Sequence, residues 1–251
     1  MLVRSLSFLL VFAATSPAAA KSLPTRNRKL SDAKSTAVSV SSATAFVRTS
    51  TAALTVEEVL SQFERYDREL QTLSADFSQT LSMKSAGLRS SIEGTVAYRK
   101  PERLRIEHMR PERQTVVCDG KNLWIYRKSQ NQAIQSSLND WRQADPALDN
   151  LLQFGSYSAV LKRYDAALEP GPVLRLQPKP SRTEKSAPFE LRLTLAPDTL
   201  FPIVSELSVE ETRIRTQFEN VRFNPQLEDA AFTFAPPAGV DVFKNFKPPK
   251  L

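Results

Sequence analysis

Apolar residues recur at three- and four-residue spacing from residue 55 to residue 73, which is the spacing of one face of an α-helix. The members of this stripe are Val56, Val59, Leu60, Phe63, Tyr66, Leu70 and Leu73. Thr55 and Glu58 provide the S/T-x-x-E sequence of a capping box, in which each side chain bonds the other residue's backbone N–H. The pattern predicts an amphipathic helix that begins after Thr55 and buries its apolar face.

From residue 74 onward the pattern changes to alternation of apolar and polar residues, which indicates β-strands with one apolar and one polar face. Apolar side chains such as Phe77 and Leu81 occupy the odd positions of 74–83, and Asp119-Gly120 marks a hairpin turn. Alternating or strand-forming runs also cover residues 92–98, 104–108, 115–118, 123–126, 189–195, 203–209 and 214–218.

A segment of helical spacing, Leu138–Lys162, separates the two sets of strands. Its apolar residues are Leu148, Leu151, Leu152, Phe154, Val160 and Leu161, with Pro146 near a helix start and Gly155 as a stop. The element order is therefore a helix, five or six strands, a short helical insert and about five more strands.

This order predicts an α+β fold with one large, curled antiparallel sheet and helices on its apolar face. A long sheet with one apolar face must curl or be covered, and only three short helices are available to cover it. Two interpretations stay open: a fully packed core, which the pattern alone favours, or a cavity between the sheet and the helices.

The N-terminus has the pattern of a secretory signal peptide over residues 1–20. Arg4 precedes the apolar run Leu6–Ala14, and Ala18 and Ala20 provide the small residues of a cleavage site before Lys21. Because lysine rather than cysteine follows the cut, we expect an exported protein that carries no lipid anchor there.

Net charge is +7, but most of it lies in residues 21–54. This segment holds six Lys and Arg residues against Asp32; with Arg4 removed, the residues after Leu54 carry a net charge of +1. Its Ser-, Thr-, Ala- and Lys-rich composition predicts a disordered linker, either a plain spacer or a segment attracted to an anionic membrane. A nearly neutral body argues against nucleic acid as a partner.

The residues needed for most enzyme chemistry are scarce. His108 is the one histidine and Cys118 the one cysteine, too few for a zinc site, and the six glycines form no phosphate-binding loop. His108 shares a strand register with Leu104 and Ile106, which predicts a satisfied inward or rim histidine, and Cys118 reads as a small buried hydrophobe. We expect no enzyme activity, no metal and no cofactor.

Five segments together resemble the outer-membrane lipoprotein carrier family, LolA. They are Leu73–Thr80 (LSADFSQT), Gly94–Arg105 (GTVAYRKPERLR), Asp119–Tyr126 (DGKNLWIY), Phe218–Asn224 (FENVRFN) and Phe232–Val242 (FTFAPPAGVDV). They follow the family's order over about 170 residues, and a LolA-like domain is expected over residues 55–243, with a short C-terminal tail at 244–251.

The resemblance implies an incomplete β-barrel of about 10–11 strands with a helical lid over its hydrophobic concave face. It implies a monomeric periplasmic carrier that takes triacylated lipoproteins from an inner-membrane ABC transporter and hands them to an outer-membrane acceptor, without ATP or metal. The alternative is a carrier or sensor of another lipid, such as a phospholipid or glycolipid, on the same fold.

Residue roles follow from the resemblance and the apolar pattern. We expect a mobile lid made from Val56, Leu60, Phe63, Leu148, Leu151, Leu152 and Phe154, and a cavity floor made from Phe77, Leu81, Val96, Leu104 and Ile106. Family members commonly hold the closed lid through an arginine before a proline, where this chain has Arg99-Lys100-Pro101. Lys100 lacks the planar fork of an arginine, so four alternatives remain: Lys100 or Arg99 is the latch, lid closure is controlled differently, or Lys100 is an exposed strand-end charge.

Overall fold

The structure is a computed structural model of the 251-residue chain, and it describes residues 53–144, 158, 164–179, 189–244 and 246. The predicted signal peptide, residues 1–20, and nearly all of the predicted linker, residues 21–54, lie outside this range. The same holds for Leu148, Leu151, Leu152 and Phe154 of the expected lid, so their roles stay predictions.

Helix α2 spans Val56–Glu69 and confirms the predicted amphipathic helix. Its capping box forms as expected: Thr55 Oγ1 accepts from the Glu58 N–H at 3.1 Å, and Glu58 Oε2 accepts from the Thr55 N–H at 3.0 Å. The buried stripe consists of Val59, Phe63 and Tyr66.

The helix ends before Leu73, which the helical spacing had included. Leu70 is the C-cap with an extended backbone, and Leu73 belongs to the first strand. Asn224, 154 residues after Leu70, binds both sides of this junction: its Nδ2 donates to Glu69 O at 3.1 Å and its Oδ1 accepts from Gln71 N at 2.7 Å. A distant side chain thus satisfies backbone groups that a longer helix would have paired.

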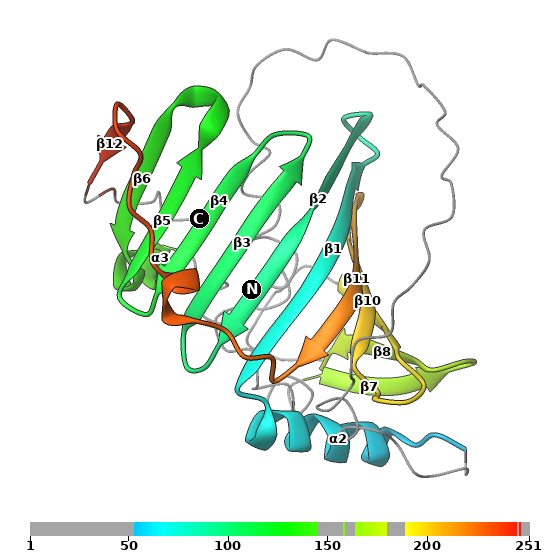
Figure 1. The fold of residues 1–251 in the computed structure, drawn as a ribbon. Helices are drawn as coiled ribbons and strands as arrows, with labels where there is room; N and C mark the ends of the chain where they lie inside the picture. Colours follow the sequence, from blue (N-terminus) through cyan, green and yellow to red (C-terminus); the bar gives the residue numbers. More distant parts are fainter. Residues whose placement is uncertain (1–52, 145–157, 159–163, 180–188, 245, 247–251) are drawn as a thin grey trace, which may run out of the picture.

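Twelve strands form one sheet in the described residues, with the order β12-β6-β5-β4-β3-β2-β1-β11-β10-β9-β8-β7 (Figure 1). They span Thr72–Met83 (β1), Leu88–Arg99 (β2), Arg103–Arg110 (β3), Gln114–Asp119 (β4), Asn122–Arg127 (β5), Gln132–Ser137 (β6), Tyr164–Glu169 (β7), Val173–Pro178 (β8), Phe189–Leu195 (β9), Pro202–Val209 (β10), Thr212–Phe223 (β11) and Asp241–Phe243 (β12). Short helices are η2 (Lys128–Gln130), α3 (Leu138–Ala144) and η3 (Asp229–Phe232).

The predicted fold class, one curled sheet that does not close into a barrel, is confirmed. β1 lies in the interior of the sheet and pairs with β2 on one side and with β11 on the other, so the two sets of strands join there. One detail differs from the expectation of an antiparallel sheet of 10–11 strands: β12 adds to β6 in parallel orientation and brings the described strands to twelve.

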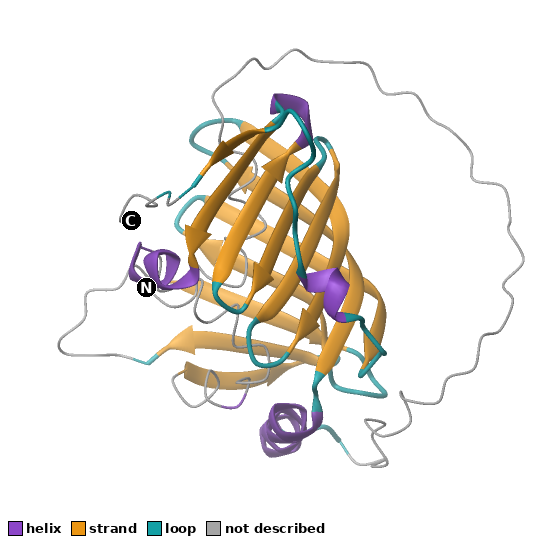
Figure 2. Ribbon diagram, turned by 60° about the vertical axis from the view of Figure 1, so that its left-hand side comes forward, coloured by secondary structure: helices purple, strands orange, loops and turns teal. Residues whose placement is uncertain are grey.

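The curl gives the sheet an inner and an outer face (Figure 2). We call inner the face that carries Leu73, Phe77, Tyr98 and Leu104, and outer the face that carries their alternate neighbours such as Asp76 and Thr95. Large buried side chains gather on the inner face, as the alternation predicts, and α2 lies across one end of the sheet (Figure 1).

Residues 224–240, which we call the C-terminal strap, cross the outer face of the sheet on their way from β11 to β12 (Figure 1). Phe232 on η3 is 1% exposed, and the Phe234 ring lies 5.4 Å from Trp124 and 5.5 Å from Tyr126. The strap therefore closes part of the outer face with a second, smaller apolar contact.

Gly94 allows β2 and β3 to approach closely at a register shift. A Cβ at this position would lie 2.0 Å from Glu107 O and 3.0 Å from Cε1 of the Phe77 ring. Glycine is therefore required because β3 backbone and an inner-face aromatic ring already occupy the space of a side chain.

Candidate functional site

The five predicted floor residues lie on the inner face of three neighbouring strands. Phe77 and Leu81 come from β1, Val96 from β2, and Leu104 and Ile106 from β3. Val96 and Ile106 are directly opposite each other in the ladder. All are buried except Leu81, which is half-buried and packs against the core. The structure brings these residues together as one apolar surface, while their role as a ligand floor stays a prediction.

The apolar surface is wider than the predicted floor. It continues on the other side of β1 through Ile214 of β11, Leu207 of β10 and Leu191 of β9, which lie opposite one another in consecutive ladders. Leu176 of β8 extends the same row. The signal for Leu191, Leu207 and Ile214 was present in the alternation of 189–195, 203–209 and 214–218, whereas Leu176 lies outside the predicted runs. The place of all four beside Leu81 depends on the pairing of β1 with β11.

Helix α2 is attached to the end of the sheet through Tyr66. Its ring centroid lies 5.7 Å from that of Phe201 and 5.4 Å from that of Phe223, and its hydroxyl donates to Thr199 O at 2.9 Å. Burial raises the pKa of Tyr66 to about 12. Of the predicted lid residues on this helix, Phe63 is buried, whereas Val56 and Leu60 are half-buried.

Lys100 contacts the last turn of α2. Its Nζ donates to Asp67 O at 2.7 Å, and its backbone N–H donates to Gln71 O at 2.8 Å. A cation suits this position because the last carbonyls of a helix lack intrahelical donors and carry the negative end of the dipole. Burial lowers the pKa of Lys100, and the nearby Asp67 charge opposes this shift. Asp67 Oδ2 also accepts from the Ser158 N–H at 2.9 Å.

Arg99 contacts the opposite side of the sheet. It forms an ion pair with Asp229, and its guanidinium lies 5.1 Å from the centroid of the Phe232 ring. The hydrogen bond from Arg99, with the charge of Arg103, holds the pKa of Asp229 below its ordinary value. The two latch candidates, adjacent in sequence, thus contact different parts of the protein: Lys100 contacts α2 and Arg99 contacts the C-terminal strap.

The inner face also carries buried polar side chains. Gln79 and Thr216 are joined by a 2.8 Å hydrogen bond across β1 and β11, and Ser205 lies opposite Thr216 on β10. His108 and Gln114 lie opposite each other on β3 and β4. The alternation already placed Gln79 and His108 on the inner face, but it gave no reason to treat them as members of a site.

The one cysteine and the one histidine of the chain, Cys118 and His108, both lie on this inner face. Cys118 is fully buried between Leu104 and Leu123 of the flanking strands, so the expectation of a small buried hydrophobe is confirmed. His108 is buried as expected, but neither ring nitrogen has a hydrogen-bond partner among the described residues, so the expectation of a satisfied histidine is wrong. Within the same residues, no group of three His, Cys, Asp or Glu side chains is placed to hold a metal ion.

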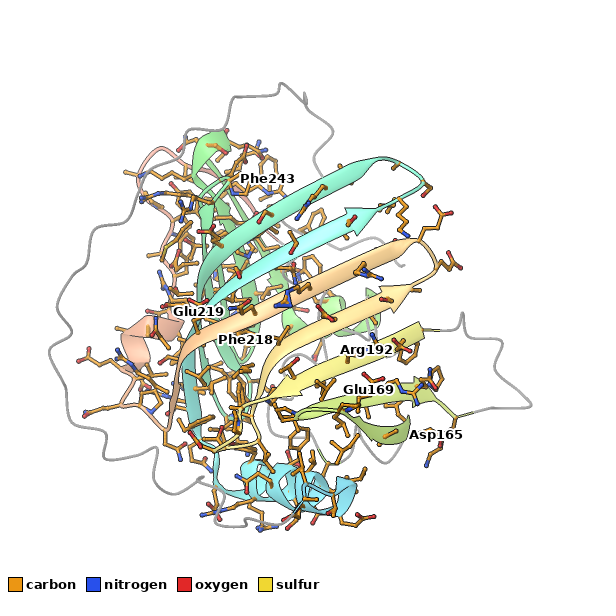
Figure 3. All side chains as sticks on the ribbon, turned by 90° about the vertical axis from the view of Figure 1, so that its right-hand side faces the viewer. Asp165, Glu169, Arg192, Phe218, Glu219 and Phe243 are labelled. Atoms are coloured by element: carbon orange, nitrogen blue, oxygen red, sulfur yellow. The ribbon has the colours of Figure 1, made fainter. Side chains whose placement is uncertain are left out.

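The outer face has a different character. A depression of about 370 Å³ there is lined by Asp76, Thr95, Arg105, Glu107, Asn220 and Arg222, among others. Further along the sheet, Glu169 of β7 pairs with Arg175 and Arg192 (Figure 3). Such charged linings suit water and polar ligands, so the apolar inner face is the candidate site for a hydrophobic ligand.

Residues 68–235 match the model of the family described as outer membrane lipoprotein carrier protein LolA, which is two thirds of the chain. The chain belongs to the LolA family. This is a family of carrier proteins rather than enzymes, in agreement with the expectation from the sparse catalytic residues.

Curated relatives of the LolA family match most of the chain. An outer-membrane lipoprotein carrier protein from Chromobacterium violaceum is 29% identical over 184 residues, which cover 73% of this chain and 86% of the relative. One of the same name from Coxiella burnetii is 26% identical over 191 residues, with 76% and 85% covered. A solved LolA superfamily protein from Nitrosomonas europaea aligns with a TM-score of 0.43 and 12% identity, covering 72% of this chain and 99% of that one.

No helix in the described part of the chain has both the length and the apolar character needed to cross a membrane.

Proposed function

We propose that this LolA family protein is a periplasmic carrier that binds the acyl chains of lipoproteins on the inner face of its sheet. The observation that carries the proposal is the wide, mostly apolar inner surface from β4 to β8, in a sheet whose edge strands β12 and β7 do not pair with each other. The printed names of the relatives, outer-membrane lipoprotein carrier protein, support lipoprotein as the cargo.

Transport across the periplasm is part of the same proposal. The signal-peptide pattern of residues 1–20 supports export. The carrier would receive cargo from an inner-membrane ABC transporter and deliver it to an outer-membrane acceptor.

Release sets a limit on how the cargo is held. Burial of acyl chains stabilises by about 0.8 kcal/mol per CH₂ group, so complete burial of two or three chains would make release too slow for a carrier. We therefore propose that α2, with Val56, Leu60 and Phe63, belongs to a lid that opens, and that Lys100 holds its last turn when it is closed. A lid of this kind allows partial burial and exchange of cargo.

The cargo can be identified directly. The full chain is expressed with its own N-terminus in a Gram-negative host, purified from the periplasm, and its hydrophobic co-purifying material is analysed by mass spectrometry. Triacylated lipoproteins would support the proposal. Phospholipid or glycolipid would point to a carrier or sensor of another lipid, and an empty protein would contradict both functions.

A matched pair of variants tests whether the inner face holds the cargo. Leu81→Glu places a charge at the half-buried end of the inner face, whereas Thr80→Glu places the same charge on the outer face one residue away. We expect the first to lower the amount of co-purified lipid at least tenfold and the second to leave it unchanged. Thermal unfolding of both variants checks that they are folded; equal lipid loss in two folded variants would contradict the proposed site.

A further inference from the structure

Five buried polar residues interrupt the apolar inner face near its middle. This polar band consists of Gln79, His108, Gln114, Ser205 and Thr216, and each of these residues is less than 9% exposed. Polar groups at such positions lose their water and need partners inside the protein or on a ligand.

Partners within the protein account for several of these groups. Gln79 Nε2 donates to Thr216 Oγ1 at 2.8 Å, and Gln114 Oε1 accepts from Arg127 Nε at 3.3 Å. His108 is different: its side chain is 3% exposed, and neither Nδ1 nor Nε2 has a hydrogen-bond partner among the described residues.

The ladder neighbours of His108 give its ring N–H little access to an acceptor. On the β2 side its ladder neighbour is Gly94, which offers no side chain. The Phe77 ring covers that space, with its centroid 5.9 Å from that of the His108 ring in an edge-to-face arrangement. On the β4 side its neighbour is Gln114, whose carbonyl oxygen is already bound by Arg127.

The protonation state of His108 defines what it can bind. Burial lowers the pKa of His108 to about 4, and the Glu107 charge only partly opposes this shift. The ring is therefore neutral near pH 7, with one N–H donor and one acceptor nitrogen. A neutral donor within an apolar surface matches a neutral acceptor that is attached to hydrocarbon.

We propose that His108 donates a hydrogen bond to the ester carbonyl that links an acyl chain to its glycerol head group. The inference rests on the proposed function, because it names a polar contact within the same ligand site. From His108 the chain can extend over Ile106 and Leu104 toward α2, a distance of about 13 Å along β3. An ester-linked lipid supplies both the carbonyl acceptor and the hydrocarbon that this surface requires.

The proposal predicts discrimination between two lipids that differ only in the linkage. The delipidated full chain is titrated with a diacyl phosphatidylglycerol and with the dialkyl ether analogue of equal chain length, each in competition with a fluorescent fatty acid. We expect the wild-type protein to bind the ester lipid about tenfold more tightly, because the ether lacks the carbonyl that His108 would bind.

Three variants assign the preference to His108. His108→Leu should bind both lipids equally, and His108→Gln, which keeps an N–H donor, should retain part of the preference. Thr95→Val removes a polar group from the outer face of β2, away from the proposed ligand, and it should leave the preference unchanged.

Each other outcome has a distinct meaning. Equal wild-type affinities for the two lipids, or an unchanged preference in His108→Leu, would overturn the role of His108 and leave the carrier function standing. Failure of the wild-type protein to bind either lipid or the fatty acid would instead contradict the proposed acyl-binding function itself.

Discussion

The inner and outer faces of strands β1–β4 are made of alternate residues of the same segments, but they are closed by different means. The inner face is a wide apolar surface with α2 across one end, and the outer face is polar except where the C-terminal strap covers it. Arg99 and Lys100, adjacent in sequence, contact the strap and α2 respectively. The difference teaches that two residues adjacent in sequence can secure two separate covers, one on each face of the sheet.

Among the substitutions that test this comparison, the largest change in the free energy of unfolding is expected on the outer face. Phe232→Ala removes a nearly fully buried ring under the strap and should lower the free energy of unfolding by about 4 kcal/mol. Phe234→Ala, at a half-buried ring, should cost less. Urea denaturation measures both, and lipid binding by the folded fraction should be unchanged; a loss of binding in the folded fraction would show that the two faces are coupled.

Acid should destabilise the protein through the inner face. The pKa of His108 is about 4 in the folded protein against 6.5 ordinarily, so between these values the unfolded state binds the proton more readily. The contribution of His108 to the free energy of unfolding is therefore fully present above pH 6.5. It is lost as the pH falls toward 4, by about 3 kcal/mol in total.

Urea denaturation between pH 7 and pH 4 measures this loss, and His108→Leu is the control. The variant should show a shallower decline than the wild type across the same window, since other groups titrate equally in both proteins. Parallel declines in the two proteins would mean that His108 is not responsible.

A smaller effect is expected where α2 joins the sheet. Lys100→Met keeps the aliphatic stem and removes the hydrogen bond to Asp67 O, which should cost about 1 kcal/mol. Hydrogen exchange of the amides in the last turn of α2 should accelerate about fivefold. Arg99→Met should instead loosen the strap and leave the exchange of α2 unchanged, and the reverse result would exchange the roles of the two residues.

The smallest effect is expected for the ion pairs of the uncovered outer face. Glu206→Gln removes the partner of Arg215 on β10 and β11, where both side chains are about 40% exposed. Because water screens such a pair, the free energy of unfolding should change by about 0.5 kcal/mol or less. Denaturation at low and high salt measures it, and a loss above 2 kcal/mol would show that this face is less solvated than its exposure indicates.

Local sequence patterns were sufficient to predict the helix and strands that have a clear capping sequence or a clear apolar–polar alternation. The capping box of Thr55 and Glu58 and the alternation around Phe77, Val96 and Leu104 correctly predicted a helix, several strands and the side chains of one apolar face. Weak signals failed: β6 has few apolar residues, and β12 has only three residues and is held by pairing with β6.

What the sequence determined by itself is therefore the face on which each strand residue lies, because alternation along an extended chain is a local property. Only the tertiary structure decided which strands are neighbours, since the residues that pair between β1 and β11 are 129 to 150 positions apart, and this pairing sets the width of the apolar surface. The tertiary structure also brought Lys100 into contact with α2 and Arg99 into contact with the strap. It left His108 without a hydrogen-bond partner among the described residues. These contacts depend on segments far apart in the chain, whose meeting no local pattern encodes.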